Sequence, residues 1–297
     1  MIDLRSLQTF HAVALLGGFH KAAEKLHTSQ PAVSARIAQL EQQLKGRLFE
    51  RDKRGCYLTT QGRELLNYAE RMLALETEMV EAVAGRKGLS GTVSLGASDT
   101  IVHTWLSDLL KLLNQEYPEI TLDVVVDSTA SMTAGLTDCT LDIALLMGPV
   151  NAGNTENLPL CNYPISWIKS PDLEITSDSP SLSELAAYPI ITFARSTRPY
   201  WQLKEMFARE GAHKARLFSN SSLSSIVRMA IDGIGIAAIP EHVVPEEIAS
   251  GKLHVIETSY EMPVMSFTAS FTERADMPLN RIVAQLAQKV AAAYWRV

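Results

Sequence analysis

Residues 19–44 restrict the fold more than any other stretch, because they hold two short helical patterns separated by a tight turn. The first pattern, FHKAAEKL, covers 19–26, and the second, QPAVSARIAQLEQQL, covers 30–44. Another apolar-periodic helix covers 4–16 and ends at a Gly-Gly pair. Two helices joined by so short a turn are typical of a helix-turn-helix, so the sequence predicts one here.

The start of the helix predicted over 30–44 carries a specific chemical signal. The hydroxyl of Ser29 is placed to accept from a free backbone N–H of the first turn. Pro31 is tolerated in that turn because the N–H that proline lacks has no helical partner there. The side chains expected to face inward recur at helical spacing: Val33, Ile37, Leu40 and Leu44.

A two-stranded wing and a long helix are predicted next. Residues 47–62, RLFERDKRGCYLTTQG, alternate loosely and carry Gly55 at a turn. The helix expected over 60–86 has apolar residues at alternating spacings of three and four, which is the seam of a heptad repeat. The seam consists of Leu65, Tyr68, Met72, Leu75, Met79 and Ala82. A lone helix could bury this stripe on its own domain, but its length and its position between two parts of the chain favour dimerisation.

After the linker predicted at 88–91, strands alternate with helices. The strands are expected at 92–98, 120–127, 141–148, 189–194, 215–220, 233–240 and 265–271. The helices are expected at 99–116, 129–138, 199–210, 221–232, 241–250 and 278–295. This alternation predicts an α/β architecture of two lobes, in which the last strand and helix return to the first lobe. Two crossing strands would then leave a cleft between the lobes.

Charge is distributed unevenly along the chain. The net charge is −6, but residues 20–63 contain nine basic and four acidic residues and so carry +5, which leaves −11 for the rest. A basic module on an acidic body indicates nucleic-acid binding by the module. A solvated charged surface would show the same counts.

The remaining features of the sequence argue against several classes of protein. No window holds 18 uninterrupted apolar residues and the first residues lack a signal-peptide pattern, so neither a membrane span nor export is expected. The cysteines are scattered and fit a reducing cytoplasm; inert thiols are the expectation and a redox sensor is the alternative. They are Cys56, Cys139 and Cys161. No metal site and no cofactor are expected. GIGIAA at 233–238 lacks the third glycine of a dinucleotide fingerprint and no catalytic triad spacing is present, so an enzyme is not expected.

FHKAAEKLHTSQPAVSARIAQLEQQLKGRLFERDKRGCYLTTQG resembles the N-terminal module of LysR-type transcriptional regulators. The long helix, GTVSLGAS, QEYPEI and GIGIAAIP follow in the order of that family, so the resemblance covers nearly the whole chain. It implies an α+β fold overall, with a winged helix-turn-helix over 1–59, a linker and dimerisation helix with a hinge over 60–90, and an effector-binding domain over 91–297. That domain would be two-lobed and similar to type 2 periplasmic binding proteins. Lobe I would hold 91–163 and 267–297, and lobe II 164–266.

The same resemblance implies a sequence-specific transcriptional regulator switched by a small metabolite between the two lobes. Such a protein binds double-stranded promoter DNA, assembles with itself as a dimer and tetramer, and meets RNA polymerase as a further partner; no membrane is involved. The alternative is a DNA-binding protein without a small-molecule effector. The α/β body of roughly 200 residues argues against that alternative, because it has the size of domains in their own right.

The residue types at the start of the helix over 30–44 suit base edges in the major groove. Gln30 can bond an adenine in bidentate fashion, Pro31 offers apolar surface to a thymine methyl, and Ser34 can donate to a base or a phosphate. Capping and solvation are the alternative roles. The family often has an arginine directly after the serine, but here Ala35 takes that position and Arg36 follows. One residue rotates a helical side chain by about 100°, so Arg36 could reach a guanine or only a phosphate. The wing cations that would neutralise phosphates are Arg51, Lys53 and Arg54.

Hydroxyl-rich segments at the ends of predicted strands are the candidate effector site. Ligands of open α/β lobes lie beyond the carboxyl ends of strands, where the N–H groups of helix N-termini suit anions. The candidates are Ser98, Asp99, Thr100, His103, Ser128, Thr129, Ser196, Thr197, Arg198 and Ser222. By resemblance, the segments at 98–100, 128–129 and 196–198 line the effector pocket of the family. Ordinary helix caps and loop hydroxyls are the alternative.

Two charged candidates suggest what the ligand carries. Arg198 could hold a carboxylate in a bidentate pair, and so could Arg195 unless it faces solvent. Asp99 is either a helix cap or a partner for a ligand amine or hydroxyl, and His103 is either a packed histidine or a neutral donor. The hypothesis is a ligand with a carboxylate for Arg198 and a donor for Asp99.

Overall fold

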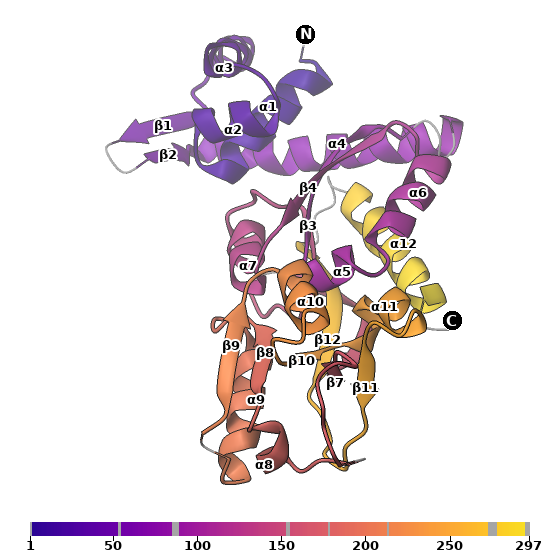
Figure 1. The fold of residues 1–297 in the computed structure, drawn as a ribbon. Helices are drawn as coiled ribbons and strands as arrows, with labels where there is room; N and C mark the ends of the chain where they lie inside the picture. Colours follow the sequence, from indigo (N-terminus) through magenta and orange to yellow (C-terminus); the bar gives the residue numbers. More distant parts are fainter. Residues whose placement is uncertain are drawn as a thin grey trace.

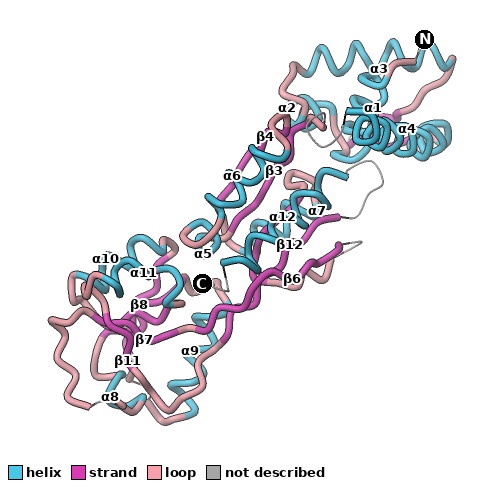
Figure 2. The backbone as a smooth tube through the Cα atoms, turned by 90° about the vertical axis from the view of Figure 1, so that its right-hand side faces the viewer, coloured by secondary structure: helices cyan, strands magenta, loops and turns pink. Residues whose placement is uncertain are grey.

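The computed structural model describes residues 2–52, 55–84, 89–152, 155–177, 179–212, 214–272 and 278–294. The chain forms a small, mostly helical domain at one end, a long helix that runs across the base of that domain, and two lobes that follow one another away from it (Figures 1 and 2). No helix in these described ranges is long and apolar enough to cross a membrane.

The N-terminal domain is a helix-turn-helix with a two-stranded wing. Its elements are α1 (Leu4–Leu16), α2 (Phe19–Lys25), α3 (Gln30–Leu44), β1 (Phe49–Asp52) and β2 (Gly55–Leu58). Ser29 caps α3, with its hydroxyl accepting from the N–H of Ala32 at 3.4 Å, as predicted. The core of the N-terminal domain includes Val33, Ile37 and Leu40. This core extends to the wing through Phe10 and Phe49, whose ring centroids lie 5.3 Å apart.

The expectation that Leu44 faces inward is wrong, since its side chain is 38% exposed. It is the last residue of α3, and the chain turns away at Lys45, which has a φ of +53°. The final turn of the helix therefore extends past the core.

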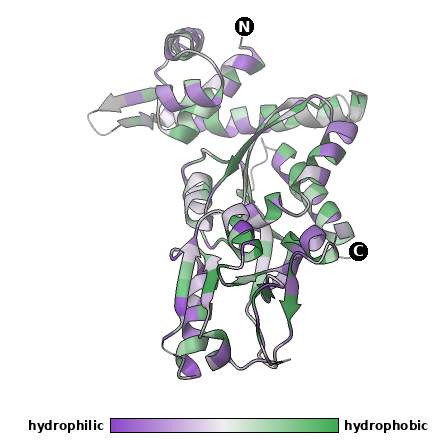
Figure 3. Ribbon diagram, viewed as in Figure 1, coloured by the Kyte–Doolittle hydropathy of each residue, from purple (hydrophilic) through white to green (hydrophobic). Residues whose placement is uncertain are grey.

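The long helix α4 (Thr60–Ala84) has two apolar faces. Ala69 and Leu73 are buried against the rest of the chain. Leu65, the first residue of the predicted seam, is half-buried and packs on the core of the N-terminal domain. The exposed stripe therefore starts later, and apolar and polar segments alternate along the helix in Figure 3. The exposed stripe consists of Tyr68 (62% exposed), Met72 (47%), Leu75 (64%), Met79 (56%) and Val83 (83%). The side chain of Ala82, the last residue of the predicted seam, lies outside what the structure describes.

Lobe I is built on a five-stranded sheet in the order β4-β3-β5-β12-β6. Its strands are β3 (Gly91–Ala97), β4 (Ile120–Val126), β5 (Ile143–Met147), β6 (Thr155–Pro164) and β12 (Val264–Thr272). β3 pairs in parallel with β4 and β5, whereas β12 pairs antiparallel with β5 and β6. The predicted return of the last strand to the first lobe is thus confirmed. β6 was not predicted, because most of its side chains are half-buried at the sheet edge and its alternation is weak.

The helices of lobe I are α5 (Asp99–Val102), α6 (Leu106–Glu116), α7 (Thr129–Thr137) and α12 (Pro278–Tyr294). The single helix predicted over 99–116 is wrong. The hydroxyl of Thr104 donates to the carbonyl of Thr100 at 2.9 Å and Trp105 is fully buried in the core, so the chain leaves the helical path between α5 and α6.

Lobe II has a second five-stranded sheet in the order β11-β7-β10-β8-β9. Its elements are β7 (Ser166–Lys169), α8 (Leu182–Leu185), β8 (Pro189–Phe193), α9 (Arg198–Arg209), β9 (Arg216–Asn220), α10 (Leu223–Ile231), β10 (Ile236–Ile239), the 3₁₀ helix Glu241–Val243, α11 (Pro245–Ala249) and β11 (His254–Ile256). The helix predicted over 241–250 is divided, because Pro245 starts a new helix at its first position. The chain passes between the lobes twice, from β6 to β7 and from β11 to β12.

Candidate DNA-reading face and effector cleft

The exposed start of α3 carries the predicted base-reading residues. Gln30 is exposed, and its Nε2 donates to Oγ of Ser34 at 2.9 Å. Pro31 and Ala35 are exposed on the same helix, and Figure 1 shows α3 at the edge of the molecule away from both lobes. The amide of Gln30 and the hydroxyl of Ser34 thus lie together on the exposed face of α3. A base edge could replace their mutual hydrogen bond with hydrogen bonds to DNA.

Arg36 points to a different part of the domain. Its Nη1 donates to Oγ1 of Thr9 at 3.1 Å, and Thr9 in turn donates to the carbonyl of Arg5 at 2.8 Å. The Arg36 side chain is half-buried against α1. The one-residue displacement from the family position therefore directs this guanidinium inward to α1 in the structure, where it connects two helices.

The wing residues are described only in part. Arg51 lies in β1 and pairs in register with Cys56 of β2. Lys53 and Arg54 lie outside the described residues. Strands β1 and β2 of the wing pair antiparallel, with Phe49 opposite Leu58 and Asp52 opposite Gly55.

The two lobes meet through the segment that follows β3. Oδ2 of Asp99 accepts a hydrogen bond from the backbone N–H of Leu223, the first residue of α10, at 2.6 Å. His103 lies 2.9 Å from the Oγ of Ser224 through its Nε2, and its Nδ1 lies 3.3 Å from Oδ1 of Asp99. Asp99 and His103 belong to lobe I and the other two residues to lobe II, so these four residues form an interlobe latch.

Several other candidates are helix caps. Ser128 caps α7 by accepting from the N–H of Ser131 at 3.2 Å, and Ser222 caps α10 by accepting from the N–H of Ser225 at 3.3 Å. Thr197 precedes α9 and donates to the carbonyl of Ala194 at 2.7 Å. The helix-cap alternative therefore describes the bonds of Ser128 and Ser222, whereas Thr197 makes a loop bond and no side-chain cap bond to α9. Thr129 begins α7 as its first residue.

Three candidates retain groups that could meet a ligand. The Oγ of Ser98 is buried and has no hydrogen-bond partner in the part of the chain that the structure describes. Arg198 and Ser196 are exposed, and Arg198 is the first residue of α9. Thr100 is buried at 3% exposure and therefore offers little surface to a ligand.

Sequence reasoning did not identify Leu223, Ser224, Lys25 or Asp142 as members of interdomain or interlobe contacts. Leu223 takes part through its backbone, which carries no sequence signal. Lys25 and Asp142 form an ion pair between the N-terminal domain and lobe I, 117 residues apart in sequence. Their separation leaves no local pattern that pairs them. No group of three or more His, Cys, Asp or Glu side chains suited to a metal ion occurs among the described residues.

A helix-turn-helix joined through a long helix to a two-lobed domain defines a class of ligand-responsive transcriptional regulator. Residues 4–63 match the family described as bacterial regulatory helix-turn-helix protein, lysR family, and residues 86–293 match the LysR substrate binding domain. The chain belongs to the LysR family of transcriptional regulators.

Individual relatives agree with this assignment. A probable RuBisCO transcriptional regulator of Chlorokybus atmophyticus is 30% identical over 268 residues, which cover 84% of this chain and 83% of the relative. A full-length OxyR variant from Pseudomonas aeruginosa has the same fold, with a TM-score of 0.64 and 24% identity over 98% of this chain and 95% of that one. Full-length LysG from Corynebacterium glutamicum with bound effector Arg gives a TM-score of 0.61 at 17% identity over 99% of both chains.

Proposed function

We propose that this LysR-family regulator is switched by a small metabolite that carries a carboxylate and binds between lobe I and lobe II. In this proposal residues 1–59 bind promoter DNA, 60–90 dimerise, and 91–297 bind the effector. The DNA-contacting side chains are those of the α3 start and the wing: Gln30, Pro31, Ser34, Arg51, Lys53 and Arg54. Arg36 acts as a brace between α3 and α1.

The observation that carries the proposal is the latch at α10. A carboxylate from lobe I occupies the N-terminus of a lobe II helix, where free N–H groups and the helix dipole favour an anion. A ligand carboxylate accepts hydrogen bonds in the same way, so it can compete with Asp99 for the N-terminus of α10. Arg198, exposed at the start of α9 on the same lobe, supplies a guanidinium for the same carboxylate.

The released Asp99 then serves as an acceptor for the ligand. A ligand amine or hydroxyl satisfies the carboxylate that Leu223 has given up. The neighbouring residue in sequence is Ser98, whose buried Oγ finds no partner among the described residues. An amino acid carries both groups. The bound effector Arg of LysG, a relative in fold, is a molecule of that kind.

Self-assembly and location complete the proposal. The exposed stripe of α4 supports a dimer, and the family supports a tetramer on the DNA, with RNA polymerase as a neighbouring partner. A regulator of promoters acts in the cytoplasm, where the thiols of Cys56, Cys139 and Cys161 remain reduced. A catalytic role has no support from the latch, because its members form a contact between lobes.

The test is a thermal-shift screen of the full-length protein against amino acids and other small carboxylates. A ligand present at 100 times its Kd stabilises the native state by about 2.7 kcal/mol, which raises Tm by a few degrees. Arg198→Ala should abolish the shift, whereas Arg209→Ala, at the other end of α9 and paired with Glu205, should preserve it. If no carboxylate shifts Tm, the effector proposal is wrong and the alternative of a DNA-binding protein without a small-molecule effector is favoured. If the shift survives Arg198→Ala, the proposed role of Arg198 in holding a carboxylate is wrong.

A further inference from the structure

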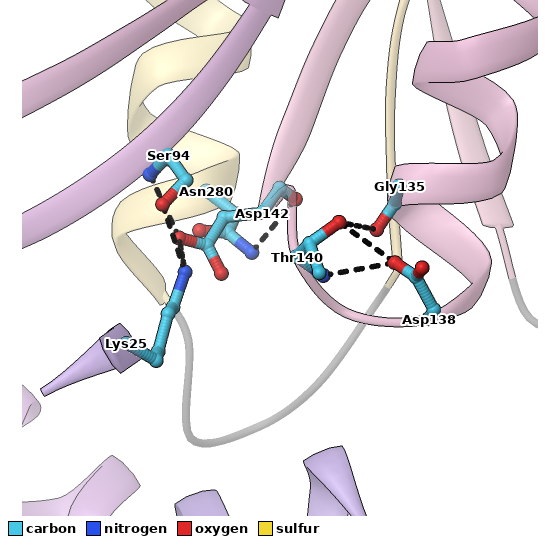
Figure 4. Close-up of polar contacts among 7 residues, drawn as sticks. All are labelled: Lys25, Ser94, Gly135, Asp138, Thr140, Asp142 and Asn280. Atoms are coloured by element: carbon cyan, nitrogen blue, oxygen red, sulfur yellow. Dashed lines mark hydrogen bonds and ion pairs between the residues drawn. The ribbon is translucent and has the colours of Figure 1, made fainter. Parts of the chain in front are cut away.

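Lys25, the last residue of α2, extends from the DNA-binding domain to lobe I (Figure 4). Its Nζ lies 2.5 Å from Oδ2 of Asp142 and donates to Oγ of Ser94 at 3.0 Å. The Lys25 side chain is 21% exposed and that of Asp142 is 7% exposed, so water screens this ion pair only in part. It therefore differs from surface pairs, which contribute little.

Asp142 is held in place by lobe I itself. Its Oδ2 also accepts from the N–H of Ser94 at 2.8 Å, and its own N–H donates to the Ser94 carbonyl at 2.9 Å. Its carbonyl accepts from Nδ2 of Asn280 in α12 at 3.1 Å. The carboxylate is thus a fixed, buried acceptor, and leaving such a charge without a cation is costly. Docking of Lys25 relieves that cost.

The surroundings of the pair are loosely packed. A cavity of about 440 Å³ lies beside it, lined by residues of both domains. They include Gln8, His11 and Leu26 of the DNA-binding domain and Val93, Cys139 and Asn280 of lobe I. Protein interiors hold few voids larger than a water molecule. The ion pair, together with Cys139 of lobe I packed on the core of the DNA-binding domain, is therefore a small contact between two bodies. Breaking it would allow the DNA-binding domain to change its orientation.

Ser94 connects the docking contact to the effector cleft through one strand. β3 pairs on both edges, with β4 and with β5, and ends at Ala97, directly before Ser98 and the latch residue Asp99. The three strand steps from Ser94 to Ala97 correspond to about 10 Å at roughly 3.3 Å per strand residue, and Asp99 follows two residues later as the first residue of α5. The part of β3 from Leu95 to Ala97 is paired on both edges, so it forms a continuous connection through which the latch can act on Ser94.

We infer that Lys25 and Asp142 dock the DNA-binding domain on lobe I, and that β3 makes this docking respond to the effector cleft. Lys25 is a positioning residue that contacts lobe I and sets the angle at which α3 is presented. In a dimer that angle fixes the distance between two recognition helices, and hence the spacing of DNA half-sites. The docking contact is independent of the proposed function. The inference that docking responds to effector binding between the lobes rests on that proposed function.

Docking is tested by hydrogen exchange on the full-length protein. Lys25→Met keeps the aliphatic stem and removes the charge, and Asp142→Asn keeps an acceptor for the N–H of Ser94. Each should accelerate exchange about fivefold in residues 22–28 and 139–145, the scale of a coupling near 1 kcal/mol. Lys21→Met, on the exposed face of α2, is the matched control and should change neither segment. Unchanged exchange in Lys25→Met would overturn the docking contact.

Half-site spacing separates positioning from a merely structural role. Duplexes selected from a random pool by the wild-type protein provide the two half-sites, which are then moved apart or together by one or two base pairs. Lys25→Met should bind an isolated half-site like the wild type but lose about fivefold of its discrimination between spacings. Wild-type discrimination in this variant would sink the positioning role.

The link to the cleft is tested without a ligand. Asp99→Ala opens the latch, so exchange should rise at the start of α10, and it should also change in residues 22–28. In the Lys25→Met background the second change should disappear. Faster exchange at α10 with no change at 22–28 would refute the link along β3 while leaving the latch intact. Unchanged exchange at α10 would instead contradict the latch on which the proposed function depends.

Discussion

The carboxylate of Asp99 in lobe I caps the first turn of α10 in lobe II, with 2.6 Å between its Oδ2 and the backbone nitrogen of Leu223. A cap normally comes from the residue that precedes a helix. Ser222 fills that role here for Ser225, so the two caps divide the free N–H groups of one helix end. The capping of α10 therefore also holds lobe I and lobe II together.

Removing this interlobe cap should loosen the lobes measurably. Asp99→Ala deletes a hydrogen bond to a charged acceptor at a helix N-terminus, an interaction of about 1–2 kcal/mol. Calorimetry of the full-length protein should show Tm lower by about 2–4 °C. Asp108→Ala serves as the control, because its pair with Lys111 is exposed on α6. Equal transitions for wild type and Asp99→Ala would contradict the latch.

The amide of Gln30 and the hydroxyl of Ser34 at the start of α3 should determine one base preference. Gln30→Ala removes the only amide of the Gln30–Ser34 pair, and a good bidentate contact to adenine contributes about 1–3 kcal/mol of discrimination. Anisotropy titrations with single-base variants of a selected duplex should show relaxed preference at one position of each half-site. Gln43→Ala, exposed at the far end of α3, should leave every preference intact. A Gln30→Ala protein with wild-type preferences would exclude this side chain as a base reader.

Arg36 should behave as a structural brace. Arg36→Ala breaks the bond to Thr9 and should lower the free energy of unfolding of the DNA-binding domain by about 1 kcal/mol. Thr9→Val, which removes the same bond from the other side, should give a similar loss. Base preference should be unchanged in both variants. A lost guanine preference in Arg36→Ala alone would mean that the guanidinium leaves Thr9 when DNA binds.

The exposed stripe of α4 should hold two chains together. Leu75→Glu places a charge in the middle of an apolar seam, and sedimentation at micromolar concentration should then show dissociated chains. Asn67→Glu is the control, since Asn67 is exposed one residue before the stripe, about 100° around the helix. Full assembly of Leu75→Glu would assign the stripe to some other partner.

Cys161 should be chemically inert near neutral pH. Burial in the core raises the pKa of its thiol from 9.0 to about 11, and the thiolate is the reactive form. Alkylation by iodoacetamide should therefore accelerate tenfold per pH unit up to about pH 11. The half-buried Cys56 and Cys139 provide internal comparison in the same mass spectra. Rapid labelling of Cys161 at pH 7.5 would reopen the redox-sensor alternative.

Local patterns predicted the local elements well. The Ser29 cap, the tolerated Pro31 and the helix over 30–44 all follow from interactions within a few residues, and all are confirmed. The helix over 99–116 was wrong because burial of Trp105, a tertiary effect, interrupts a sequence with continuous helical periodicity. Periodicity indicates which face of a helix is apolar, but it does not indicate where in the tertiary structure a large side chain will be buried.

Contacts between distant segments were beyond sequence reasoning. Asp99 was recognised as a helix-terminal carboxylate, but its partner Leu223 lies 124 residues away and contributes a backbone N–H that any residue would have. Likewise Lys25 was counted among the cations of a DNA-binding module, yet in the structure its charge is neutralised by Asp142. Only the arrangement of the domains in space identifies such pairs.

The apolar stripe of α4 has a consequence for gene dosage if it pairs two chains, as proposed. A chain that covers Tyr68, Met72, Leu75 and Met79 by self-association would be mostly paired only at concentrations above the dissociation constant of the pair. Below that concentration, occupancy of a two-site promoter would rise with the square of the number of chains. A twofold change in gene dosage would then alter occupancy about fourfold at a constant level of effector.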